Sequence, residues 1–359
     1  VVAGPHLPGS GATPILRWRG STAGGGGDRT TVSPIVDLRK RLVDQRDDVL
    51  FTVRTDRRAY LRLTAPDRFD GRLWTSDGRF AKADGQLPST QPERETTQTV
   101  DAEIRIVGLA AIWAPAPFEA RSLPRASGPL LWDEESSTLI VGRGEETSDG
   151  LAYEVVSEVP ELDAAQLAAA DAADAADIDT RYLELPADFP ARARQAAQEA
   201  TRGAEGRYAT ALALQDWFRT NFTYSLEVPA GHSDDALVDF LQSREGYCEQ
   251  FAGAYAAMAR SLGLPARVAV GFTPGEGDPN EAGLYRVRGR HAHAWPEVWF
   301  PQIGWVAFEP TPGRGMPGAE AYTGVPEAQD DTAPTIHIVT TTAPTTTTPG
   351  ATPTTAAPV

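Results

Sequence analysis

Three residues in the second half of the chain have side chains suited to thiol acyl transfer. Cys248 is the only cysteine among 359 residues, His293 follows 45 residues later, and Glu309 follows the histidine by 16 residues. A thiol nucleophile works with an imidazole that moves protons and with a third group that orients the imidazole. The order cysteine, histidine, acid suits a thiolate–imidazolium pair held by a carboxylate.

The sequence around Cys248 predicts that the thiol begins a helix. Apolar residues recur at helical spacing after it, at Phe251, Tyr255, Met258 and Leu262. A Gly-Leu-Pro sequence at 263–265 ends the helix. Because the start of a helix carries a partial positive charge, we expect the pKa of the thiol to be lowered. The alternative is an inert, buried cysteine that packs as a small apolar side chain.

A predicted hairpin brings the other two residues together. Residues 291–300 have the pattern of a strand, 301–304 form a turn, and 305–309 return antiparallel. A turn near Gln302 therefore folds Glu309 back toward the strand that carries His293. A lone histidine beside tryptophan is usually structural and a lone glutamate is usually a surface charge, so their joint order supports the hypothesis.

A metal site is the alternative use of this strand. His291, His293 and Glu297 supply imidazole and carboxylate groups, both of which suit zinc, and the i, i+2 spacing places both histidines on one strand face. No further Cys/His cluster supplies a fourth ligand. We therefore expect no metal, nucleotide or other cofactor.

Composition excludes several classes of partner. The formal net charge is −16, which argues against nucleic acid and against an anionic membrane surface. No run of 18 or more apolar residues is present, so nothing in the sequence is expected to span a membrane. A single cysteine forms no internal disulfide, and cysteine content therefore does not fix the compartment.

Pattern changes along the chain predict five regions and an α+β fold. They are a flexible leader at 1–32, a β-rich domain at 33–160, an Ala/Asp-rich linker or helix at 161–184, an α+β domain at 185–315, and a Thr/Pro-rich disordered tail at 316–359. Short strands separated by turns in the β-rich domain suggest a sandwich or barrel. The α+β domain has a helical half followed by an antiparallel β-meander, which includes strands at 267–272 and 284–287.

Four stretches of the second domain resemble the transglutaminase-like superfamily of papain-type thiol enzymes. They are Gly246-Tyr247-Cys248-Glu249-Gln250-Phe251-Ala252, residues 263–272, His293-Ala294-Trp295-Pro296-Glu297-Val298-Trp299, and Gly304-Trp305-Val306-Ala307-Phe308-Glu309-Pro310-Thr311. Together they span about residues 185–315 and are highly specific as a set.

The first domain resembles, more weakly, the segment that precedes this core in bacterial multi-pass membrane proteins of the same group. The similarity lies in residues 33–38 and in the stretch from Tyr60-Leu61-Arg62 to Phe69-Asp70-Gly71-Arg72-Leu73-Trp74. In those proteins the soluble part lies outside the cytoplasm between transmembrane helices. The resemblance therefore implies the extracytoplasmic face of a bacterial membrane, with anchoring helices outside this segment.

The resemblance also implies a role for each residue of the set. Cys248 is the nucleophile, His293 the base and acid, and Glu309 the orienting carboxylate, where the family usually has aspartate. The backbone N–H of Cys248 contributes to the oxyanion hole, and Tyr224 is a candidate for its second donor.

The expected activity is acyl transfer at carboxamide or peptide carbonyls through a Cys248 thioester. Amine transfer, deamidation and hydrolysis stay open, and the expected partner is a protein or peptide, including one associated with the cell wall. A second hypothesis is a non-catalytic module that binds cell-envelope partners. A third is a papain-type cysteine protease, although the Cys-Gly-Ser/Ala-Cys-Trp/Tyr signature is missing.

Overall fold

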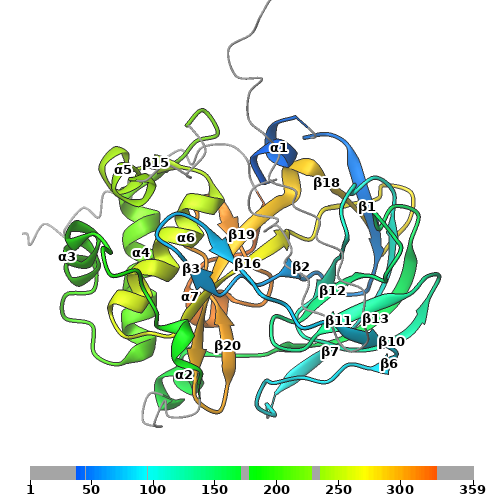
Figure 1. Ribbon diagram of the computed structural model, residues 1–359, viewed down its shortest axis with the longest axis horizontal. Coiled ribbons are helices and arrows are strands. Elements are labelled where there is room, and N and C mark those ends of the chain that lie inside the picture. The colour runs from blue at the N-terminus through cyan, green and yellow to red at the C-terminus, as the bar shows by residue number, and fades with distance from the viewer. Residues whose placement is uncertain (1–37, 45, 95, 171–177, 229–234, 330–359) are drawn as a thin grey trace, which may run out of the picture.

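The computed structural model describes residues 38–44, 46–94, 96–170, 178–228 and 235–329. The predicted leader and residues 330–359 of the predicted tail lie outside these ranges. The fold is α+β, as predicted, with most helices on one side and most strands on the other (Figure 1). No helix within the described ranges combines the length and hydrophobicity needed to cross a bilayer.

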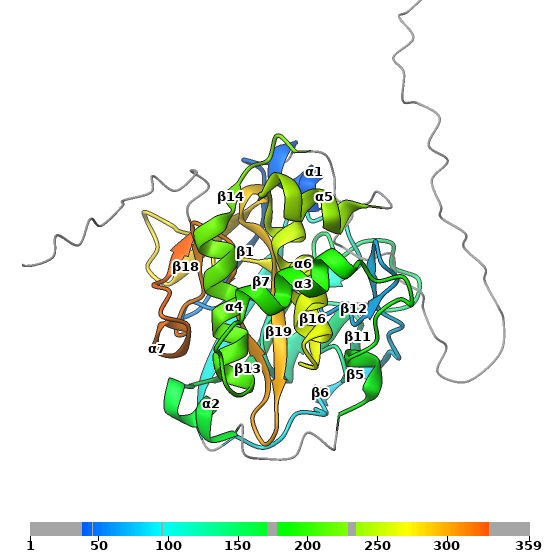
Figure 2. The same cartoon turned by 90° about the vertical axis from the view of Figure 1, so that its left-hand side faces the viewer.

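The helix that starts at Cys248 is the centre of the helical half. This helix, α6 (Cys248–Ser261), is apolar nearly all round and is buried along most of its length. Such a helix belongs in a core, and α3 and α4 pack against it (Figure 2). The other helices are α1 (Leu38–Val43), α2 (Ala164–Ala170), α3 (Ala191–Ala200), α4 (Arg207–Asn221), α5 (Ala236–Ser243) and α7 (Glu320–Thr323).

A five-stranded sheet lies under α6 and holds the predicted hairpin. Its strand order is β20 (Gly304–Ala307), β19 (Ala292–Phe300), β16 (Ala266–Phe272), β2 (Leu61–Thr64) and β9 (Ala116–Pro117). Strands β19 and β20 pair antiparallel, and Gln302 at φ 63° and Gly304 at φ 88° make the turn. The hairpin prediction is therefore confirmed.

Two strands of the first region extend this sheet, and Gly271 of β16 permits the pairing. Strand β2 pairs with β16 there, and a Cβ on Gly271 would lie 2.0 Å from the carbonyl oxygen of Leu61. Only glycine permits so close a backbone approach. Across the sheet, Gly271 is paired with His293. The glycine thus allows residues near 60 to lie beside the strand that carries the histidine.

A seven-stranded sheet also mixes the two regions (Figure 1). Its order is β17 (Glu276–Gly277), β18 (Leu284–Arg288), β1 (Val49–Arg54), β7 (Thr97–Ile106), β13 (Ala152–Pro160), β10 (Ala120–Ala126) and β6 (Gly85–Gln86). Strand β18, expected in the meander, pairs instead with β1. A local pattern predicts a strand but not its partner.

The remaining strands form smaller sheets. A four-stranded sheet contains β5 (Ala81–Ala83), β11 (Leu130–Asp133), β12 (Thr138–Val141) and β8 (Trp113–Ala114). Two-stranded pairs are β3 (Arg68–Phe69) with β4 (Trp74–Thr75), β14 (Thr223–Tyr224) with β15 (Glu245–Gly246), and β21 (Arg314–Gly315) with β22 (Ala328–Gln329). The first region is mostly β, as expected, but its strands share two sheets with the second and do not close into a separate sandwich or barrel. The division into domains stays a prediction.

The predicted disordered tail is wrong over its first 14 residues, 316–329. Helix α7 and strand β22 lie there, and the side chains of Tyr322 and Val325 are buried. The hydroxyl of Tyr322 donates to the carbonyl of Ala307 at 3.0 Å. The few apolar residues of this stretch pack against the core. The Thr/Pro composition of the whole tail gave no indication of this.

Candidate active site

Cys248 is the first residue of α6, where the sequence placed it, and only 1% of it is exposed. Tyr247 precedes the helix in an extended conformation, and its backbone N–H donates to Oε1 of Gln250 at 2.9 Å. This bond, from the N-cap residue to the third helical residue, fixes the start of the helix. The N–H of Cys248, one of the first four in the helix, has no acceptor within it.

The electrostatics of the thiol differ from the expectation. Burial raises the pKa of Cys248 to about 12, although Arg314 and the backbone N–H of Ala294 act in the opposite direction. The prediction of a lowered pKa was therefore wrong. It counted the helix dipole and omitted the cost of placing a thiolate in a site without solvent.

His293 and Glu309 meet as predicted. The Nε2 atom of His293 lies 2.8 Å from Oε2 of Glu309, and both side chains are buried. Strand β19 carries the histidine, and the glutamate follows β20 at the end of the hairpin. The Nδ1 atom of His293 is buried and makes no hydrogen bond to any described residue, Cys248 included. Ala294, the next residue, has its backbone N–H at the Cys248 sulfur.

The carboxylate of Glu309 accepts from two further donors. The hydroxyl of Tyr60 donates to Oε2 at 2.9 Å, and the backbone N–H of Thr311 donates to Oε1 at 3.1 Å. Burial by itself raises the pKa of Glu309, but His293, Arg219 and Tyr60 together hold it below its usual value. The site therefore keeps this carboxylate ionised.

Helix α4 fixes the backbone around the same residue. Gln215 accepts from the N–H of Glu309 at 3.1 Å. One guanidinium nitrogen of Arg219 donates to the carbonyls of Glu309, Thr311 and Arg314 at 2.9, 2.7 and 3.0 Å. The loop after β20 is thus tied to a helix some 90 residues earlier in the chain, and the carboxylate sits on a rigid support.

Tyr60 is the site residue that the sequence did not reveal. Its ring packs edge-on against His293, with ring centroids 5.4 Å apart, and against Trp295 at 5.0 Å. It comes from the first region, immediately before β2. Tyr60 lies in the stretch that carries the weaker resemblance of the first region, but nothing there indicated a role in the site, because only the pairing of β2 with β16 brings it to the histidine.

The three residues considered as metal ligands are not arranged on β19 as expected. His291 ends a 3₁₀ turn (Gly289–His291) before β19, and its Nδ1 accepts from the N–H of Arg288 at 2.9 Å. The carboxylate of Glu297 is paired with two buried arginines, Arg62 and Arg267. Within the described ranges, no three Cys, His, Asp or Glu side chains are grouped to hold a metal ion.

The suggested second oxyanion donor lies close to the helix start. Tyr224 is buried on β14, where it pairs with Gly246 of β15. Its ring centroid lies 6.0 Å from the guanidinium of Arg314. Its role stays a prediction.

Two known protein families match parts of this chain. The sequence profile of the Transglutaminase-like superfamily matches residues 194–310, and that of the TgpA N-terminal domain matches residues 1–164. The resemblance inferred from the sequence motifs is thereby confirmed.

Two curated relatives match part of the chain. Uncharacterized protein YebA of Bacillus subtilis is 38% identical over 145 residues, and a protein-glutamine gamma-glutamyltransferase of Pseudomonas aeruginosa is 40% identical over 134 residues. The matches cover 38% and 36% of this chain but only a fifth of each relative.

Solved structures extend the similarity to the β-rich region. The periplasmic domain of TgpA from Pseudomonas aeruginosa is 26% identical and superposes with a TM-score of 0.59, covering 80% of this chain and 94% of that one. The same domain bound to ethylmercury gives 27% identity and a TM-score of 0.58, over 77% and 93% of the two chains. The α+β fold, with a mostly-β first region and a transglutaminase-like core, is therefore shared.

Proposed function

Because residues 194–310 form a transglutaminase-like domain, we propose that this protein is a thiol-dependent acyl transferase acting on carboxamide or peptide carbonyls. One observation carries the proposal. The imidazole of His293 is held by Glu309 through Nε2 and keeps Nδ1 without a hydrogen bond to any described residue, on the strand that contacts the helix of Cys248. This is the arrangement of an oriented base near a nucleophile.

The proposed reaction begins with proton transfer. Nδ1 of His293 accepts the thiol proton as the Cys248 sulfur bonds to the carbonyl carbon. The backbone N–H of Cys248 stabilises the oxyanion. The imidazolium then protonates the departing nitrogen, the C–N bond breaks, and a thioester remains. An amine or water attacks the thioester, its proton returns through His293, and the thiol is regenerated.

Burial explains why the base is needed. With a pKa of about 12, the isolated thiol of Cys248 supplies almost no thiolate at neutral pH. A proton acceptor must therefore act during the attack, and Glu309 stabilises the imidazolium that forms. The same burial is the observation that favours the second candidate, a binding module in which Cys248 is a packed, unreactive side chain.

The relatives narrow the proposed reaction and location. The 40% identity to a protein-glutamine gamma-glutamyltransferase favours glutamine carboxamides as acyl donors and primary amines as acceptors. The structural similarity to a periplasmic domain favours an extracytoplasmic location. We extend the proposal to protein partners of the bacterial cell envelope, with anchoring by parts of a longer protein.

The test is incorporation of a fluorescent primary amine into dimethylcasein, with ammonia release measured in parallel. We expect wild type to be active and Cys248→Ala to lose all turnover while keeping its melting temperature. Ammonia release without amine incorporation would assign deamidation, and casein cleavage would assign proteolysis. Equal rates for wild type and the variant would refute the thiol mechanism.

Alkylation of the single thiol separates the enzyme from the binding module. We expect iodoacetamide to react with Cys248 below pH 8.5, the ordinary thiol pKa being about 8.5, and this reaction to disappear in His293→Ala. The dependence on the histidine would show proton transfer between the two groups. Sluggish alkylation in both proteins, rising only toward pH 12, would favour the binding module.

A further inference from the structure

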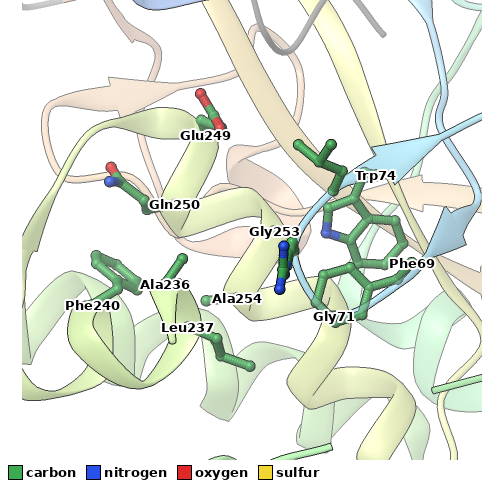
Figure 3. A pocket seen from close by; sticks show the side chains of 12 residues that line it. Phe69, Gly71, Trp74, Ala236, Leu237, Phe240, Glu249, Gln250, Gly253 and Ala254 are labelled. Atoms are coloured by element: carbon green, nitrogen blue, oxygen red, sulfur yellow. The ribbon is translucent and has the colours of Figure 1, made fainter. Parts of the chain in front are cut away.

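A groove runs along α6, next to the proposed nucleophile, and the proposed reaction does not yet use it (Figure 3). Its floor is formed by residues of the first two turns of α6, including Glu249 and Gly253. One wall is the β3–β4 hairpin, with Phe69 and Trp74, and the other is α5, with Leu237 and Phe240. The groove is open to solvent, and its cavity volume is about 50 Å³.

The walls are apolar and aromatic. Phe69 and Trp74 stack on each other with ring centroids 4.9 Å apart, and the guanidinium of Arg260 lies 4.6 Å from the centroid of the Trp74 indole. The hairpin is held in turn by Asp70, whose carboxylate accepts from the N–H groups of Arg72 and Leu73 at 2.8 Å. The aromatic wall is thus a fixed surface that can receive a side chain.

One polar group in the groove has no partner in the described ranges. Trp74 is 4% exposed, and its Nε1 makes no hydrogen bond to a described residue. The atom points across the helix at Gly253, where a Cβ would lie 3.2 Å from it (Figure 3). A buried indole N–H normally finds an acceptor, so the groove is equipped to receive one from a ligand.

The charges in the groove select a neutral ligand. Glu249 lies at the end nearest Cys248, and its carboxylate accepts from the hydroxyl of Tyr247 at 2.8 Å. Arg72 lines the same groove, so a cationic alkylammonium would meet charges of both signs. A polypeptide offers carbonyl acceptors for the indole N–H, N–H donors for the carboxylate, and apolar side chains for the walls.

We propose that this groove binds the acyl-donor polypeptide beside its reactive glutamine, with an apolar side chain between the β3–β4 hairpin and α5 and a backbone carbonyl accepting from Trp74. The inference rests on the proposed function for the chemistry at Cys248. It assigns the first region of the chain a role in substrate recognition, since the hairpin belongs to that region. The amine acceptor would bind elsewhere.

Gly253→Ala is the smallest change that tests the assignment. The added methyl group would lie on the floor of the groove, 3.2 Å from Nε1 of Trp74, so that the indole must shift slightly. Alanine is a better helix former than glycine, which offsets part of the cost of this contact, and the melting temperature is measured beside binding. The matched control is Gly277→Ala, since a Cβ at Gly277 has no neighbour within 4 Å. One methyl group in a tight pocket changes discrimination by about 10-fold or more.

Two readouts are needed. In Cys248→Ala, binding of a fluorescein-labelled peptide with a single glutamine flanked by leucines reports on the groove without turnover. In this background, we expect Gly253→Ala to raise the Kd of the peptide about 10-fold and Gly277→Ala to leave the Kd of the peptide unchanged. In the active protein, Gly253→Ala should raise KM for the same peptide and leave KM for the amine and the iodoacetamide rate unchanged.

These measurements test the groove separately from the proposed reaction. If wild type shows no turnover but the peptide Kd responds to Gly253→Ala, the groove stands and the reaction does not. No peptide binding by Cys248→Ala, or an unchanged Kd and KM in Gly253→Ala, would overturn the groove. A raised KM for the amine alone would reassign the groove to the acceptor and would likewise overturn the proposal.

Discussion

Tyr60→Phe isolates one hydrogen bond of the candidate site. The variant keeps the ring that packs on His293 and removes only the hydroxyl that donates to Glu309 at 2.9 Å. His293 and Thr311 still donate to the same carboxylate. A hydrogen bond to a charged group contributes about 1.5–3 kcal/mol. If the loss of this hydrogen bond raises the activation free energy by half of that amount, kcat falls about 4- to 13-fold.

The pH profile gives the result a specific signature. The Tyr60 hydroxyl donates to the ionised carboxylate, which lowers the pKa of Glu309. Its removal raises that pKa, so Glu309 becomes protonated at a higher pH than in wild type. We expect the acid limb of kcat for amine incorporation to move to higher pH, with KM for the amine unchanged.

Tyr153→Phe is the matched control. Tyr153 is buried, and its hydroxyl donates to the carbonyl of Pro115 at 2.5 Å, in the β-rich region. Tyr153→Phe should lower the free energy of unfolding by about 1 kcal/mol and leave kcat and its pH profile unchanged. Wild-type kcat and an unshifted acid limb in Tyr60→Phe would refute the reasoning, as would equal losses in both variants.

Three further substitutions test the surroundings. Glu309→Gln should lower kcat by about 10³-fold or more, measured as initial rates, by removing the charge opposite the imidazolium. Because the folded-state pKa of Glu309 is lowered, its stabilisation is present above about pH 4.3 and fades as pH falls through the folded pKa. The melting-temperature gap to this variant should therefore narrow in acid. Gly271→Ala should cost about 1–3 kcal/mol in urea unfolding, since its methyl group meets the Leu61 carbonyl; unchanged stability would contradict the close approach. Glu297→Ala leaves two buried arginines without their carboxylate and should lower the free energy of unfolding by about 3–5 kcal/mol. A loss below 1 kcal/mol would contradict this.

Local signals were sufficient for most individual elements. Helical spacing after Cys248 predicted α6, and the turn before Gly304 predicted the β19–β20 hairpin that joins His293 to Glu309. These features depend on residues close in the chain, where periodicity and turn chemistry act directly. The two members of the candidate site that share a hairpin were therefore predicted from sequence.

Pairing between strands far apart in the chain could not be predicted from the sequence. Short strands were predicted in the first region, but nothing local indicates that β1 pairs with β18 and that β2 pairs with β16. The same pairing brings Tyr60 to Glu309, so this site residue was missed. Apolar residues of 316–329 were likewise assigned to a disordered tail, because their burial depends on a core formed elsewhere.

The sequence by itself determined the candidate reactive groups, their order and the family that they resemble. Residue identity and local spacing carry that information. Only the tertiary structure decided the ionisation of Cys248, whose pKa rises to about 12 because folding excludes solvent from the thiol. It alone decided that a tyrosine from the first region completes the carboxylate's hydrogen bonds. Desolvation and long-range contacts are properties of the packed chain, and no stretch of sequence contains them.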